Sequence, residues 1–138
     1  MTPLIQTRIA KTQASAGGNC LAACYCAIID RPELLEPLSD AMEPAKTSDM
    51  QRVFANKFLQ PLGWTVLTLI NFDDGEEQMS GPSVAPLIHV ATGMGPRGMH
   101  HAIVRMADGS FHDPHPSGGG LHEHINRFDV LVKLTRGE

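Results

Sequence analysis

Three cysteines lie within the stretch GGNCLAACYC, and the first of them, Cys20, follows two glycines and an asparagine. A thiol in the first turn of a helix lies among unsatisfied backbone N–H groups and at the positive end of the helix dipole, and both favour an anion. The thiolate is the reactive form of cysteine, so this position suits a nucleophile. Cys24 and Cys26 fall further along the same predicted helix, where core packing is the ordinary role of a free cysteine. Cys20 is therefore the candidate nucleophile.

A partner for this thiol stands late in the chain, in HHAIVRMADGSFHDPHP (100–116). The segment predicts a hairpin: a strand that begins with histidine, an Asp-Gly turn, and a return strand that ends at Asp113. A histidine can take the proton of a thiol and later give it to a leaving group. A carboxylate can hold that imidazole in the required tautomer. His101 is the candidate base, with Asp113 to orient it. His100 is the alternative base, because neighbouring strand residues face opposite ways.

The register of this hairpin decides whether Asp113 reaches His101. A plain two-residue turn would pair Asp113 with Val104 and leave it ~10 Å from His101 along the strand, on the opposite face. A bulged turn, with Gly109 in the left-handed conformation, would shift the register and change the face. The sequence leaves both registers open.

The chain order of helix-start cysteine, strand-start histidine and later acid resembles that of the papain-like cysteine peptidases. The chain is similar to the bacteriocin-leader peptidases and phytochelatin-synthase-type enzymes of that superfamily. It looks closer still to small bacterial and phage proteins with GNC, HAIV and HDPHP motifs. The resemblance implies an α+β papain-like fold that covers residues 1–138 as a single domain. It also implies that Cys20, His101 and Asp113 form a catalytic triad.

The resemblance implies in addition an oxyanion-hole glutamine upstream of the cysteine, for which Gln6 and Gln13 are both candidates. The second oxyanion donor would be a backbone N–H at the helix start, that of Cys20. The expected activity is thiol-dependent hydrolysis of a peptide or amide substrate, or acyl transfer to an amine, through an acyl-enzyme and without a cofactor. Arg97, in the segment MGPRG, is a candidate contact for a substrate carboxylate.

Two other functions fit the same residues. One is a catalytically silent binding module on the papain-like fold, such as a phage protein that captures a host factor, and a Cys20 buried by the SGGG segment would favour it. The other is a zinc-binding domain, because seven histidines and three cysteines supply imidazole and thiolate ligands. His112 with His115, and His122 with His124, are possible ligand pairs. No Cys-x-x-Cys pair is present, so we expect no bound metal.

Length and composition limit the function classes. A chain of 138 residues, 42 % hydrophobic and 19 % charged, suits a single soluble globular domain. A net charge of −4 with scattered basic residues argues against a nucleic-acid surface. No apolar run reaches the ~18 residues that a membrane span requires. The clustered cysteines suit a reducing compartment, so we expect the cytoplasm of a bacterium or of a phage-infected cell.

The elements that must position these residues fall into two halves. A helix is predicted over 20–29 with Asn19 as its N-cap, and a second helix begins at a capping box formed by Ser48 and Gln51. Alternating patterns predict strands later in the chain, at 64–70, 86–92, 100–106, 110–113 and 128–134. Helices first and strands afterwards predict a helical half packed on an antiparallel sheet.

Overall fold

The computed structural model describes residues 1–9, 18–70, 87–122 and 125–135. The helices are α1 (Cys20–Ile28), α2 (Leu35–Met42) and α3 (Ser48–Leu59), with the 3₁₀ turns η1 (Pro32–Leu34) and η2 (Gln60–Leu62). The strands are β1 (Trp64–Ile70), β2 (His89–Met94), β3 (His100–Arg105), β4 (Phe111–His112) and β5 (Ile125–Lys133). Along the described chain the helices therefore precede the strands.

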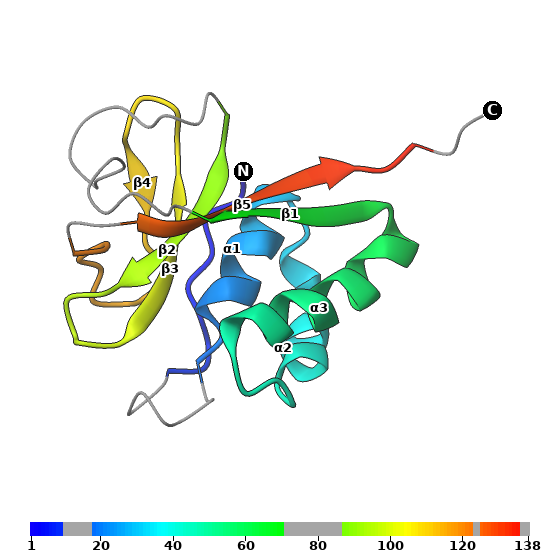
Figure 1. Ribbon diagram of the computed structural model, residues 1–138, viewed down its shortest axis with the longest axis horizontal. Helices are drawn as coiled ribbons and strands as arrows, with labels where there is room; N and C mark the ends of the chain where they lie inside the picture. Colours follow the sequence, from blue (N-terminus) through cyan, green and yellow to red (C-terminus); the bar gives the residue numbers. More distant parts are fainter. Residues whose placement is uncertain (10–17, 71–86, 123–124, 136–138) are drawn as a thin grey trace.

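The strands form one antiparallel sheet in the order β1-β5-β2-β3-β4. The helices lie on one side of this sheet, where α1 packs against β3 and β2, and α3 packs against β1 (Figure 1). The predicted α+β class, with a helical half on an antiparallel sheet, is confirmed. Two strand starts differ from the prediction, because β2 begins later, at His89, and β5 begins earlier, at Ile125. No helix in the described ranges is long and apolar enough to cross a membrane.

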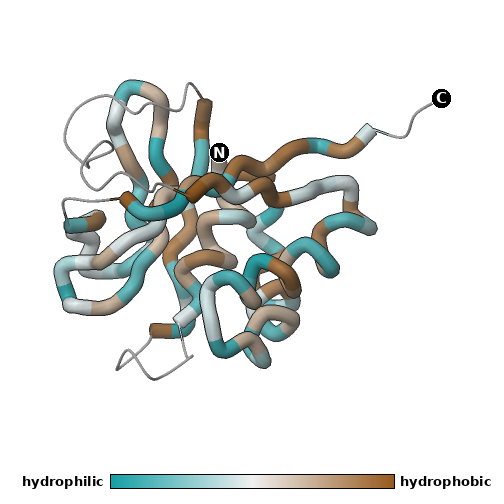
Figure 2. The backbone as a smooth tube through the Cα atoms, in the orientation of Figure 1, coloured by the Kyte–Doolittle hydropathy of each residue, from teal (hydrophilic) through white to brown (hydrophobic). Residues whose placement is uncertain are grey.

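The core is centred on α1, whose residues from Leu21 to Ala27 are all buried. The structure buries this helix on nearly every side because α2 covers one flank and the sheet the other. Figure 2 shows apolar residues concentrated in α1 and along β1 and β5. A smaller apolar cluster joins Ile103 and Phe128, which alternate in their strands with residues that face α1. Burial of α1 thus fixes the position of its first residue, Cys20.

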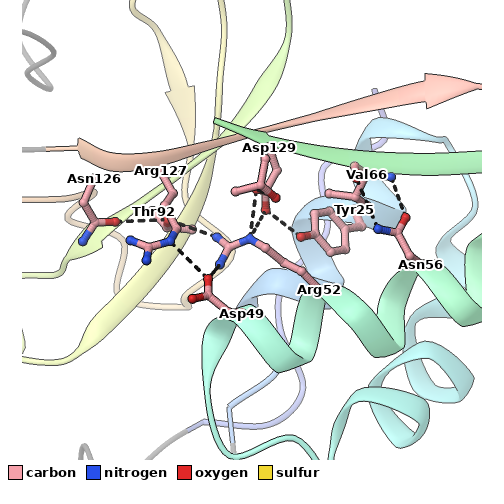
Figure 3. A network of polar contacts seen from close by, with 10 residues as sticks. Tyr25, Asp49, Arg52, Asn56, Val66, Thr92, Asn126, Arg127 and Asp129 are labelled. Carbon is pink, nitrogen blue, oxygen red and sulfur yellow. Dashed lines mark hydrogen bonds and ion pairs between the residues drawn. The ribbon is translucent and has the colours of Figure 1, made fainter. Parts of the chain in front are cut away.

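A buried polar network ties the helical half to the sheet (Figure 3). Asp129 of β5 is fully buried and accepts hydrogen bonds from the Tyr25 hydroxyl at 2.6 Å and the Thr68 hydroxyl at 2.8 Å. The Arg52 Nε atom donates to both carboxylate oxygens, at 2.9 and 3.0 Å. A buried carboxylate needs such a partner, since an isolated charge away from water is very costly. The network therefore connects α1, α3, β1 and β5 through one side chain.

The predicted cap of α3 is wrong by one residue. Thr47, rather than Ser48, is the N-cap, and its hydroxyl accepts a hydrogen bond from the Met50 N–H at 3.1 Å. Thr47 has the extended backbone that an N-cap requires, whereas Ser48 is already helical. The start of α3 consequently lies one residue earlier, at the edge of the cleft described below.

Candidate active site

The hairpin register follows the bulged turn rather than the plain one. His112 of β4 lies opposite Val104 of β3, and Gly109 in the turn has φ of 92°. Glycine adopts this left-handed backbone without the Cβ strain that other residues meet. The register moves Asp113 onto the face of the hairpin from which His101 projects, because side chains alternate along a strand.

Asp113 contacts His101 directly. The imidazole Nε2 atom donates to Asp113 Oδ1 at 2.6 Å, and the side chains are 6 % and 4 % exposed. The carboxylate also accepts backbone N–H groups, from His115 to Oδ1 and from Gly120 to Oδ2, each at 2.8 Å. Burial raises the pKa of Asp113, but these hydrogen bonds, led by that from His101, outweigh it and leave the pKa below its ordinary value. Asp113 is therefore an ionised, firmly held partner for the imidazole.

His101 also contacts the thiol of Cys20. Burial lowers the pKa of His101, but hydrogen bonds with Asp113 and Cys20 outweigh it and raise the pKa to about 9. Since Asp113 occupies Nε2, the Nδ1 atom is the ring nitrogen left for the sulfur. The imidazole is thus a cation at neutral pH, set between a thiol and a carboxylate. The alternative base, His100, is exposed, and the contacts to Cys20 and Asp113 belong to its neighbour.

The three cysteines differ in environment. Cys20 is the first residue of α1 and is half-buried, whereas Cys24 and Cys26 are fully buried. Burial raises the pKa of Cys24 well above its ordinary value and raises that of Cys26 to about 12. These two thiols therefore stay protonated and inaccessible. Of the three, Cys20 alone combines a helix start, a cationic partner and access to a cavity.

That cavity is a cleft of about 440 Å³ lined by Cys20 and His101. The N-terminal segment, the starts of α1 and α3, and strands β2, β3 and β5 all contribute to its lining. The volume falls in the range of small-molecule and peptide side-chain sites. The candidate nucleophile and base therefore open onto a space that a substrate can enter.

Gln6 also lines this cleft and is 6 % exposed. Its backbone N–H donates to Pro114 O at 2.8 Å, which fixes the N-terminal segment beside the hairpin. The side-chain Nε2 donates one hydrogen to Arg8 O at 2.8 Å and retains a second N–H. Of the two glutamine candidates, Gln6 is thus placed at the cleft with a donor to spare. Gln13 lies outside the described residues.

Asn19 occupies the N-cap position of α1, as the sequence predicts, but its side chain makes no cap hydrogen bond. Its Oδ1 atom accepts the backbone N–H groups of Thr7 and Arg8, at 3.0 and 2.9 Å, and makes no cap bond to α1. Its Nδ2 atom donates to the hydroxyls of Thr7 and Ser39. These contacts with the N-terminal segment and with Ser39 of α2 hold the side chain away from the helix. Asn19 therefore joins the segment that carries Gln6 to the start of α1.

Arg97 lines the cleft as well, half-buried, with Nη1 donating to Gly118 O at 2.8 Å. The glycine segment, residues 117–120, packs on the loop that carries Arg97. A Cβ added at Gly119 would lie 2.8 Å from Pro96 Cγ. Through Gly120 the same segment holds Asp113. Cys20 keeps its access to the cleft.

Two features of the cleft are not predicted from the sequence, which marks His115 only as a possible zinc ligand. The His115 ring stands 6.2 Å from the His101 ring in an edge arrangement and lines the cleft. Burial, Arg97 and His101 lower the pKa of His115, so a neutral ring flanks the cationic one. The one indication in the sequence is that His115 lies two positions after Asp113. The second feature, a set of polar residues from α3, β2 and β5, had no signal in the sequence.

No group of three histidine, cysteine or acidic side chains capable of holding a metal occurs among the described residues. His124, from one of the possible zinc pairs, lies outside them. Comparison of the chain with protein-family models, curated proteins and solved structures finds no match. The geometry of the cleft is therefore the basis for a functional assignment.

Proposed function

We propose that this protein is a papain-like cysteine hydrolase or acyl transferase that acts on a peptide or amide bond. The observation that carries the proposal is the placement of His101 between Cys20 and Asp113 beside an open cleft. A cationic imidazole beside a thiol stabilises the thiolate, and the helix start adds to this effect. The buried carboxylate keeps the imidazole oriented.

The reaction begins when the Cys20 thiolate attacks the substrate carbonyl carbon and the π electrons move to oxygen. The backbone N–H of Cys20 and the second N–H of Gln6 stabilise this oxyanion. The intermediate collapses with cleavage of the C–N bond, and the His101 imidazolium gives its proton to the departing amine. The product is a thioester on Cys20. Water attacks this thioester with His101 as base to complete hydrolysis, and an amine in place of water completes transfer.

The alternative function is a binding module, which would have the same fold but would not use the Cys20 thiol. It predicts a Cys20 that the glycine segment covers. The contacts of that segment with Pro96, Arg97 and Asp113, and the exposure of Cys20 to the cleft, favour the enzyme.

An activated ester tests this proposal without knowledge of the natural substrate. We expect p-nitrophenyl acetate to leave an acetyl group on Cys20, seen by peptide mass mapping, and to release more than one equivalent of nitrophenolate per chain. Cys20→Ala should abolish the release, and His101→Ala should slow it by about 10²-fold or more. His122→Ala, at an exposed histidine outside the cleft lining, is the matched control and should leave the rate unchanged. Release that survives in Cys20→Ala would contradict the proposal, as would an acetyl group that is never discharged.

A further inference from the structure

One side of the cleft carries an excess of cationic and hydrogen-bond-donor groups. We call the following residues the polar wall: Asp49, Arg52, Thr92, Asn126 and Arg127. Together with Lys46 and Arg97, they bring four basic side chains to the cleft, against one acidic side chain among its described lining residues. The whole chain has a net charge of −4. Because the buried Asp129 compensates the charge of Arg52, three basic side chains remain against Asp49, and this excess of positive charge attracts anionic ligands.

A β-bulge places two successive residues of β5 in the polar wall. Thr92 of β2 pairs with Arg127, whereas Gly93 pairs with Ile125, so that Asn126 is the extra residue. Regular alternation would send Asn126 and Arg127 to opposite faces of the sheet. With the bulge, both line the cleft, and Figure 3 shows both side chains on the same side of β5. Bulges commonly redirect a side chain in this way beside functional sites.

The hydrogen bonds of the polar wall leave donors without acceptors. Asp49 is the charged acceptor, and it receives the Arg127 Nε at 3.2 Å and lies 3.5 Å from the Arg52 Nη1 atom. The Asn126 Oδ1 atom accepts from the Thr92 hydroxyl at 3.4 Å. Within the part of the chain that the structure describes, the terminal nitrogens of Arg127 and the Asn126 Nδ2 atom have no acceptor. Figure 3 shows these Arg127 nitrogens turned away from Asp49.

Arg52 supports the wall from behind. It is 5 % exposed, and Asp129 compensates its charge through the Nε atom. Its Nη2 atom donates to the Thr92 hydroxyl at 3.3 Å, and among the described residues its buried Nη1 atom has no hydrogen-bond acceptor. The guanidinium is thus rigid, and its unsatisfied nitrogen lies at Asp49, in the cleft lining. The donors of Arg127 and Asn126, which Asp49 and Thr92 hold in place, suit a planar acceptor with two oxygens, which is a carboxylate.

We infer that the polar wall binds a carboxylate side chain of the substrate, so that the preferred acyl donor is an acidic peptide segment. Arg127 is the residue that contacts the carboxylate, because its two terminal nitrogens match two oxygens in a bidentate pair. Asp49 holds the guanidinium through Nε without occupying those nitrogens. This inference rests on the proposed function for the identity of the bound molecule as a substrate.

Two short peptides of equal length test the inference: acetyl-Ala-Glu-Glu-Ala-amide and acetyl-Ala-Gln-Gln-Ala-amide. Binding to the wild-type protein, and to Cys20→Ser so that cleavage does not consume the peptide, is followed by ¹⁵N NMR titration. We expect the glutamate peptide to bind at least about five-fold more tightly, with shifts at Asn126 and Arg127. The preference should fall in high salt, because ionic screening weakens exposed charge pairs.

Arg127→Gln should reduce the preference to less than about two-fold, and Arg127→Lys should restore only part of it, because an ammonium lacks the planar fork. Lys133→Gln, at the exposed end of β5, changes the net charge equally and should leave the preference intact. Equal binding of the two peptides, no binding of either, or a preference unchanged in Arg127→Gln would overturn the inference. Binding does not require a reactive thiol. A retained preference with an inert Cys20 would therefore overturn the proposed catalysis and leave the carboxylate site standing.

Discussion

Two buried carboxylates, Asp113 and Asp129, each accept hydrogen bonds from three residues, yet they have different partners. Asp129 faces a guanidinium and two hydroxyls that do not change charge in the physiological pH range. Asp113 faces His101, whose protonation can change and which reaches the cleft. The two carboxylates are therefore similarly buried but have different roles. The network at Asp129 joins the helical half to the sheet, and the one at Asp113 prepares a titratable group for chemistry.

The largest expected effect is a loss of protein stability when the Asp129 network is disrupted. Asp129→Asn leaves the buried Arg52 guanidinium without its counter-charge, and breaking a buried pair in this way costs about 3–5 kcal/mol. Urea denaturation should show this loss in the free energy of unfolding, with little change between pH 6 and 9, because the partners of Asp129 are a guanidinium and hydroxyls rather than an imidazole. Asp108→Asn, at an exposed turn, is the control and should change the free energy little. A loss no larger than that of the control would show that the network does not join the two halves.

The Asp113 network should give a smaller and pH-dependent effect. The raised pKa of His101, about 9, means that its stabilising contribution is complete below the ordinary value near 6.5 and is lost as the pH rises through 9. The lowered pKa of Asp113 adds stability that is present above its ordinary value near 4 and is lost as the pH falls.

Asp113→Asn should therefore lower the free energy of unfolding by about 1–3 kcal/mol at pH 6, and by distinctly less at pH 10. Urea denaturation at the two pH values checks this. An identical loss at both would mean that His101 is not held as a cation by Asp113, and the contrast with Asp129 would disappear.

Two of the three candidate site residues have a local signal in the sequence. Cys20 follows glycines at a helix start, and His101 is the second residue of β3. The pairing of Asp113 with His101 was left open, since it depends on the conformation of Gly109, which has φ of 92°. A single glycine can adopt either turn, so composition alone does not select the register. The α+β class was predictable for a similar reason, because helical and alternating patterns occupy separate parts of the chain.

The sequence does not predict the Asp129 network or the role of Asn19. Arg52 and Asp129 lie 77 positions apart, and no local pattern marks two charges that meet only in the folded core. Asn19 has the residue type and position of an N-cap, but tertiary contacts with the N-terminal segment compete successfully for its side chain. The bulge that brings Asn126 into the cleft is likewise a property of strand pairing. Contacts between residues far apart in the chain are thus not predicted by local sequence patterns.

The central claim is that His101 activates Cys20, and selective alkylation tests it most directly. At pH 6 an ordinary cysteine, with a pKa of ~8.5, is less than about 1 % thiolate. Limiting iodoacetamide should nevertheless label Cys20 almost exclusively, as peptide mapping would show, because Cys24 and Cys26 are buried. His101→Ala should slow this labelling by about ten-fold or more, since only the helix start then favours the thiolate. Labelling no faster than that of free cysteine, or indifferent to His101→Ala, would contradict the claim.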